Sequence, residues 1–208
     1  MSTLVRYDVQ HRVAVVTIDN PPVNALGPGV LEGIERAVAR GAEDAAVDAI
    51  VLAGAGGRFV AGADIRIFDT LKTREQSLER SGRTHALLRR LEDCAKPLVA
   101  AIDGHALGGG LELAMACHYR VASPGAKVGQ PEVSLGLIPG AGGTQRLPRL
   151  CGAKTALELC TTGKPVSAAR ALDEGIVDRI ATDGLAGTAA AFARERAAAG
   201  EVRRTRDL

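Results

Sequence analysis

The sequence has few aromatic residues, no tryptophan and no region where charge of one sign accumulates. Aromatic residues make up 2% of the 208-residue chain, which leaves little to stack on nucleobases. The 26 basic and 24 acidic residues are interspersed and give a formal net charge of +2, so no broad charged field is available to hold nucleic acid or an anionic membrane. We therefore expect neither nucleic acid nor a membrane as a partner.

The chain also lacks the patterns of a disulfide framework, a zinc site and a membrane anchor. The four cysteines form no CxxC pair and do not have the spacing of zinc ligands, which favours a reducing compartment and no bound metal. Charged residues occur within the first twelve positions, before any apolar run develops, so no signal peptide is expected. No stretch approaches the roughly 18 apolar residues of a membrane span. These features predict a cytoplasmic protein.

Nucleotide-binding signatures are missing as well. The chain contains no GxxxxGK[ST] motif, which excludes a P-loop, and the glycine cluster at residues 104–110 does not spell GxGxxG. A dinucleotide-binding fold is therefore not expected, and neither is dehydrogenase activity of this chain.

Predicted strands and helices alternate along the chain, which indicates an α/β fold. Apolar residues make up 46% of the sequence, enough for one buried core, so we expect a single domain over residues 1–200 and a basic tail or the start of a linker over 201–208. The first two strands are predicted to form a hairpin and the later, continuously apolar ones a parallel sheet. Predicted strands cover 4–9, 13–18, 49–53, 98–102, 119–122 and 176–180, with a short one near 128; predicted helices begin near 30, 74, 111, 168 and 188.

Two glycine-rich loops follow buried strands. Residues 54–65 follow the strand at 49–53, and residues 103–112 follow the strand at 98–102. Loops at the carboxyl ends of strands present backbone N–H groups to ligands, and glycine lets those groups approach closely. Two such loops side by side could aim two N–H groups at one oxygen, although a single glycine-rich turn is more often a packing device.

Two glutamates stand out because their neighbours are apolar or glycine. Glu112 lies in the first turn of an otherwise apolar helix, where the helix N-terminus can hold a carboxylate ionised; alternatively, Glu112 only caps that turn. Glu132 precedes an apolar, glycine-containing segment, and the alternative is an exposed turn residue. Paired carboxylates that face one pocket move protons on both sides of a reacting bond, but spacing alone does not show that these two meet.

Three longer motifs occur in a fixed order: FVAGADI at residues 59–65, HALGGGLE at 105–112, and GQPE at 129–132 leading to GAGGTQRL at 140–147. Together they closely resemble the motifs of the crotonase (enoyl-CoA hydratase/isomerase) superfamily, and the resemblance runs from about Val13 to Ile180. It implies a spiral of ββα units, an acyl-CoA thioester as substrate, and chemistry that uses neither a metal nor a redox cofactor.

The resemblance also implies roles for individual positions. Glu112 and Glu132 match the two catalytic carboxylates of the hydratases, and the amides of Ala63 and Gly109 match the oxyanion hole that stabilises an enolate. The other matches concern substrate binding: Ala61 and Ile65 at the adenine pocket, Arg66 where several relatives carry Lys near the CoA phosphates, and Gly140 close to the catalytic water.

The activity that the resemblance implies is hydration of trans-2-enoyl-CoA to 3-hydroxyacyl-CoA, a lyase reaction of the fatty acid β-oxidation type. Two alternatives stay open: Δ3,Δ2-enoyl-CoA isomerisation, which needs one carboxylate, and a catalytically idle acyl-CoA-binding or assembly module. The ending at Leu208 is similar to the join that follows the hydratase part of bifunctional hydratase/3-hydroxyacyl-CoA dehydrogenases. A truncated C-terminal helical segment, a fused or separate dehydrogenase part and a homo-oligomer are therefore further expectations.

Overall fold

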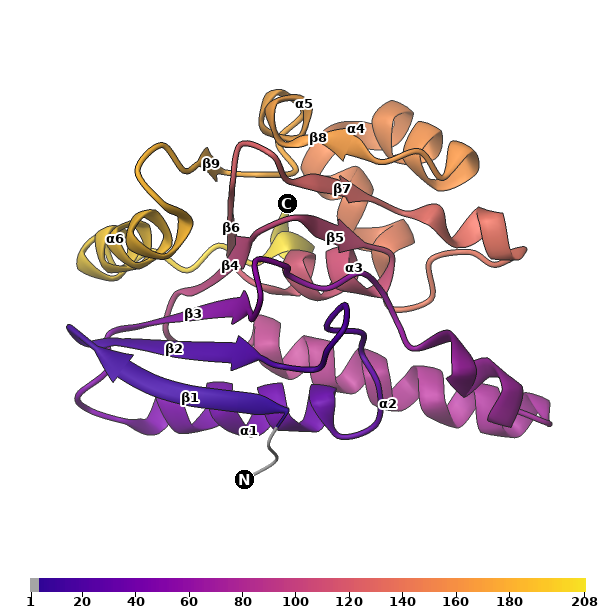
Figure 1. Cartoon of the computed structure of the whole chain (residues 1–208), viewed down its shortest axis with the longest axis horizontal. Coiled ribbons are helices and arrows are strands. Elements are labelled where there is room, and N and C mark those ends of the chain that lie inside the picture. Colours follow the sequence, from indigo (N-terminus) through magenta and orange to yellow (C-terminus); the bar gives the residue numbers. More distant parts are fainter. Residues whose placement is uncertain (1–3) are drawn as a thin grey trace.

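Two sheets form the framework of the molecule (Figure 1), as seen in a computed structural model that describes residues 4–208. The first three residues of the domain predicted over 1–200 lie outside this range. One sheet has the order β1 (Val5–Gln10), β2 (Val13–Ile18), β3 (Ala49–Gly54), β4 (Leu98–Ile102), β6 (Tyr119–Ala122), β9 (Arg179–Ile180), and the other has the order β5 (His105–Leu107), β7 (Lys127–Gly129), β8 (Val166–Ser167).

The larger sheet confirms the predicted hairpin and the predicted parallel strands. β1 and β2 pair antiparallel, with Val5 opposite Ile18, and each further strand from β3 to β9 is parallel to its neighbour. The last strand is shorter than predicted. Ile176 and Val177 are buried, and the amide of Val177 donates to the carbonyl of Ala171 at the end of a helix, so the strand begins only at Arg179.

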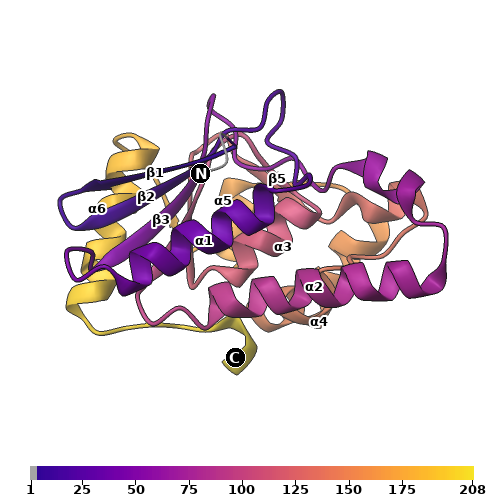
Figure 2. The same cartoon turned by 90° about the horizontal axis from the view of Figure 1, so that it is seen from below.

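Helices cover both faces of the larger sheet. α1 and α2 lie side by side across one face in both views, and α6 packs on the opposite face (Figures 1 and 2). On α1, Val30, Ile34 and Val38 are buried because they recur at helical spacing, as the sequence predicts. The helices are α1 (Val30–Glu43), α2 (Arg74–Glu92), α3 (Gly109–Ala116), α4 (Gly143–Thr162), α5 (Ala168–Asp173) and α6 (Leu185–Ala198), with 3₁₀ turns η1 (Ile65–Thr70), η2 (Pro131–Leu135) and η3 (Thr205–Asp207).

The chain alternates between the two sheets in a regular way. β4 lies in the larger sheet, β5 in the smaller one, and α3 follows; β6 and β7 repeat the same step before η2 and α4. Each step is a ββα unit, so successive units wind as a spiral, and the expected α/β class and architecture are confirmed. None of the helices within residues 4–208 is long and apolar enough to cross a membrane.

The C-terminal residues 201–208, predicted as a basic tail or the start of a linker, pack against the domain. Thr205 is 1% exposed, and its hydroxyl donates to the Met115 carbonyl at 3.0 Å. The amide of Arg206 donates to the buried Glu92 carboxylate at 2.9 Å. A buried carboxylate needs such donors, and they hold the segment onto α2 and α3.

Candidate active site

The two glycine-rich loops lie side by side, as predicted. The amide of Val60 donates to the carbonyl of His105 (3.1 Å), and the amide of Leu107 donates to the carbonyl of Val60 (3.2 Å). This contact requires glycine at residue 110, because a Cβ there would stand 2.1 Å from the Val60 carbonyl oxygen. The close approach of the loops is therefore a consequence of glycine at this position.

Two backbone amides at this junction are left without acceptors among residues 4–208. Gly109 is the first residue of α3, where amides have no partner within the helix. The amide of Ala63 also makes no hydrogen bond, since its neighbours Gly62 and Asp64 carry the backbone pairing with Leu26. A Cβ built on Gly109 would stand 3.4 Å from the nitrogen of Ala63. The two residues are thus adjacent, and their N–H groups are available to a ligand.

Glu112 is buried on α3 and is held by the start of another helix. It is 2% exposed, and its Oε1 accepts hydrogen bonds from the amides of Ala141 and Gly143, both at 2.7 Å. Gly143 is the first residue of α4. The donors therefore come from the N-terminus of α4 and its preceding loop, and the alternative that Glu112 caps its own helix is wrong.

The pKa of Glu112 is raised, even though a helix N-terminus favours the ionised form of a carboxylate. Burial raises the pKa of Glu112 more than the two amide hydrogen bonds lower it, although His85 and Arg146 also lower the pKa. The reason is that desolvation penalises the charged form. Glu112 is therefore able to take up a proton more readily than an exposed glutamate.

Glu132 is half-buried on η2 and faces α3. A Cβ on Gly108 would stand 3.0 Å from Glu132 Oε1, and Gly108 has a φ of 50°, so this position requires glycine for two reasons. Burial, with a smaller contribution from the negative charge of Glu112, raises the pKa of Glu132 to about 7. The alternative of a solvated turn glutamate is wrong.

Gln130 is a site residue that the sequence analysis missed. It is fully buried, and when its amide is oriented to satisfy its surroundings, the nitrogen donates to Glu132 Oε1 at 2.9 Å and to Oε2 at 3.1 Å. Its position two residues before Glu132 in the GQPE motif was the available signal. The motif does not reveal that the amide turns back onto the carboxylate.

His85 and Arg146 form a further layer that was not predicted. His85 Nε2 and the Gly140 carbonyl are hydrogen-bonded at 2.8 Å, and Arg146 Nη1 donates to the Ala141 carbonyl at 3.2 Å. Both side chains hold the loop whose Ala141 amide binds Glu112. Arg146 belongs to the GAGGTQRL motif, whereas no sequence signal marks His85, 55 residues from Gly140.

A cavity of about 480 Å³ brings the predicted site residues together. Apolar side chains that are largely exposed, Ile65, Leu135 and Ile138, also face it. Arg66 is the exception among the predicted residues: its side chain is 85% exposed and paired with Asp64 at 2.8 Å, outside the cavity lining. The predicted residues that line the cavity are Ala61, Ala63, Ile65, Gly109, Glu112, Glu132 and Gly140.

The spiral of ββα units and this cavity define a crotonase-type α/β protein. The family model for enoyl-CoA hydratase/isomerase matches residues 8–203. The chain belongs to the enoyl-CoA hydratase/isomerase family.

Relatives and solved structures agree with this assignment. The chain is 50% identical over 175 residues to a probable enoyl-CoA hydratase of Bacillus subtilis (strain 168), covering 84% of this chain and 68% of the relative. It is 48% identical over 191 residues to the peroxisomal bifunctional enzyme of Danio rerio, covering 91% of this chain but only 26% of that protein. The crystal structure of enoyl-CoA hydratase from Bacillus anthracis superposes with a TM-score of 0.86 at 34% identity, covering 93% of this chain and 76% of that one.

Proposed function

We propose that the chain hydrates trans-2-enoyl-CoA thioesters to 3-hydroxyacyl-CoA. One observation carries the proposal: two buried or half-buried carboxylates, Glu112 and Glu132, share a cavity with the unpaired amides of Ala63 and Gly109. Addition of water across a conjugated double bond requires this combination, because one group must activate water, another must deliver a proton, and the thioester oxygen must be stabilised.

The amides of Ala63 and Gly109 act on the thioester carbonyl. Attack of water at the β-carbon moves the double-bond electrons toward the carbonyl and creates an enolate oxygen. Two fixed N–H donors stabilise this charge without reorganisation, and such donors contribute about 3–4 kcal/mol each in other enzymes. Because the reaction changes no oxidation state, it requires no redox cofactor.

The carboxylates handle the protons. Glu112, in its ionised form, takes a proton from water as the oxygen bonds to the β-carbon. Glu132 carries a proton in a large fraction of molecules near neutral pH, because its pKa is raised to about 7, and this protonated form gives its proton to the α-carbon. Glu112 ends protonated and Glu132 ionised, and exchange with solvent restores the starting state. Isomerisation of 3-enoyl-CoA, which needs a single carboxylate, is a side activity that uses the same enolate.

The rest of the cavity would bind the substrate. Ala61, Ile65 and Gly140 line it, and we assign the first two to the adenine part of CoA and Gly140 to the water. Arg66 would contact the CoA phosphates. Its exposed guanidinium pairs with Asp64 and could release this partner to bind a phosphate instead. A 3-hydroxyacyl-CoA dehydrogenase, fused or separate, would consume the product, and a homo-oligomer in the cytoplasm is the proposed state.

The proposal is tested with crotonyl-CoA and free crotonic acid, following loss of the enoyl absorbance. We expect turnover of the thioester only. Gly109→Pro should slow it by about 10²–10³-fold, because proline removes one donor to the enolate oxygen. Gly109→Ala keeps the donor, and its Cβ meets its neighbours at ordinary contact distances of 3.4–3.7 Å. A folded parent chain that binds crotonyl-CoA without hydrating it would favour the idle acyl-CoA-binding module instead.

A further inference from the structure

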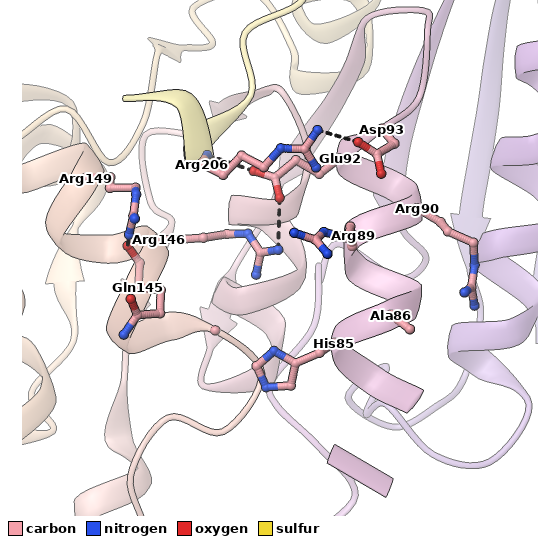
Figure 3. Close-up of a pocket in the computed structure, with 11 residues that line it drawn as sticks. His85, Ala86, Arg89, Arg90, Glu92, Asp93, Gln145, Arg146, Arg149 and Arg206 are labelled. Carbon is pink, nitrogen blue, oxygen red and sulfur yellow. Dashed lines mark hydrogen bonds and ion pairs between the residues drawn. The ribbon is translucent and has the colours of Figure 1, made fainter. Parts of the chain in front are cut away.

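A second cavity, of about 670 Å³, opens between α2, α4 and the C-terminal segment (Figure 3). It shares no lining residue with the cavity of Glu112 and Glu132. Its wall is formed mainly by charged and polar side chains: His85, Ala86, Arg89, Arg90, Glu92, Asp93, Gly142, Gln145, Arg146, Arg149 and Arg206.

The two carboxylates of this cleft already have partners. Glu92 accepts from Arg146 at 3.0 Å and from the amide of Arg206 at 2.9 Å, and Asp93 is paired with the Arg206 side chain. Arg90 turns away from the cleft (Figure 3) and pairs with Glu35 on α1. The remaining arginines therefore outnumber the acids that face them.

Neither Arg89 nor Arg149 forms an ion pair among the described residues; Arg89 lowers the pKa of Asp93 from beyond ion-pair distance, and Asp93 is already paired with Arg206. Within residues 4–208, the Arg89 side chain makes no hydrogen bond or ion pair, and Arg149 donates only to the Gln145 carbonyl, at 2.6 Å. Figure 3 shows the guanidinium of Arg89 directed at that of Arg146 across the cleft. Like charges that face one cleft repel each other, and a bound anion would relieve this repulsion.

Arg146 supplies a fixed anchor in this cluster. Its side chain is 12% exposed and is held by the Glu92 carboxylate and the Ala141 carbonyl. An arginine fork that is already oriented binds phosphate oxygens at little further cost in conformational entropy. The cavity volume also falls within the roughly 300–1,000 Å³ of small-molecule sites.

We propose that this arginine cleft binds a small phosphate-bearing molecule through Arg89, Arg146 and Arg149. The site goes beyond the proposed hydration and does not depend on it, because neither carboxylate of the first cavity takes part. Phosphate fits better than a single carboxylate, since its oxygens can accept from the three guanidinium groups at once.

The test is calorimetric titration of the whole chain with inorganic pyrophosphate at constant ionic strength. We expect binding by the parent chain and about 10²-fold weaker binding by the double variant Arg89→Gln/Arg149→Gln, because two charge-assisted partners are lost. Arg83→Gln is the matched control: it removes an exposed arginine of α2 that pairs with Glu79 and lines neither cavity, so pyrophosphate binding should be unchanged. Arg66→Gln reports separately on any binding at the proposed CoA site. Arg146 stays in place because it also supports the loop at Glu112.

Titrations with inorganic phosphate and with AMP identify the source of the phosphate. For binding that the double variant Arg89→Gln/Arg149→Gln loses, inorganic phosphate binding as well as AMP would assign the cleft to the free anion, and tighter binding of AMP would assign it to a phosphate ester. The proposal is overturned if the parent chain binds none of these probes, if the double variant binds like the parent, or if Arg66→Gln is the variant that loses binding.

Discussion

Glu112 and Glu132 line one cavity, yet the fold holds them by different means. Backbone amides at the start of α4 fix Glu112, whereas the side-chain amide of Gln130 holds Glu132, which lies against Gly108. The donors to Glu112 are backbone groups that no side-chain truncation deletes, although His85 and Arg146 hold the loop that carries one of them. A carboxylate held by a side chain is open to tuning through that side chain. The same residue type is therefore suited to two roles.

The pKa values of the two glutamates are both raised, but different groups act on them. Burial raises both pKa values, and the negative charge of Glu112 further disfavours ionisation of Glu132. Amide hydrogen bonds, His85 and Arg146 all lower the pKa of Glu112. The pKa of Glu132 is raised to about 7. A pKa of about 7 lets Glu132 gain and lose a proton near neutral pH.

The largest expected effect comes from removing one carboxylate at a time. Glu112→Gln should slow hydration of crotonyl-CoA by about 10²–10⁴-fold, the usual range for a lost general acid or base. It should spare isomerisation of a 3-enoyl-CoA more than Glu132→Gln does, because isomerisation needs one shuttling carboxylate. Rates of both reactions for both variants measure this difference.

Glutamine retains the shape of glutamate and part of its hydrogen bonding, so the rates report proton transfer once melting curves show that both variants are folded. If folded Glu112→Gln hydrates crotonyl-CoA at the parent rate, the two-carboxylate mechanism is wrong and the contrast between the two positions has no catalytic meaning.

A smaller effect should follow from changing the side chain that holds Glu132. Hydration requires protonated Glu132, so kcat/KM should decline as the pH rises through about 7. Gln130→Met removes a donor that favours the ionised form, which should raise the pKa of Glu132 and move this decline upward by about one pH unit.

The exposed Gln145 offers the matched control, since Gln145→Met makes the same chemical change away from Glu132. An unshifted pH profile in folded Gln130→Met, or an equal shift in Gln145→Met, would show that Gln130 does not tune Glu132.

The smallest effect concerns stability. The folded-state pKa of Glu132, about 7, lies above the ordinary value of 4.5, so the folded chain binds this proton more tightly than the unfolded chain. The resulting stabilisation is complete below pH 4.5 and is lost as the pH rises to about 7. Between pH 5 and pH 8, the free energy of unfolding should therefore fall more for the parent than for Glu132→Gln. Urea denaturation at both pH values measures this, and equal losses would mean that the pKa of Glu132 is ordinary.

Many of the strands, helices and loops could be predicted from local patterns in the sequence. The hairpin of β1 and β2, the buried strands β3 and β4 and the amphipathic α1 were predictable because alternation and helical spacing of apolar residues are properties of neighbouring positions. The glycine-rich loops were predictable as a pair for the same reason: each follows a buried parallel strand, and such strands end at one edge of the sheet. Three ordered motifs then identified the superfamily.

By itself, the sequence determined the strands of the larger sheet, most of the helices, the two loops and the two glutamates that mark the site. The strands β5 and β8 and their pairing with β7 in a second sheet were decided by the tertiary structure. Only the tertiary structure decided how the glutamates are held. The donors to Glu112 lie 29 and 31 residues away, at the start of α4, and His85 reaches Gly140 across 55 residues. Residues 201–208 likewise became part of the domain only through the buried Glu92 and the Met115 carbonyl. Periodicity reports which face of an element is buried, but the partner of a buried polar atom is set by how distant elements pack, because that packing alone brings a donor within hydrogen-bonding distance.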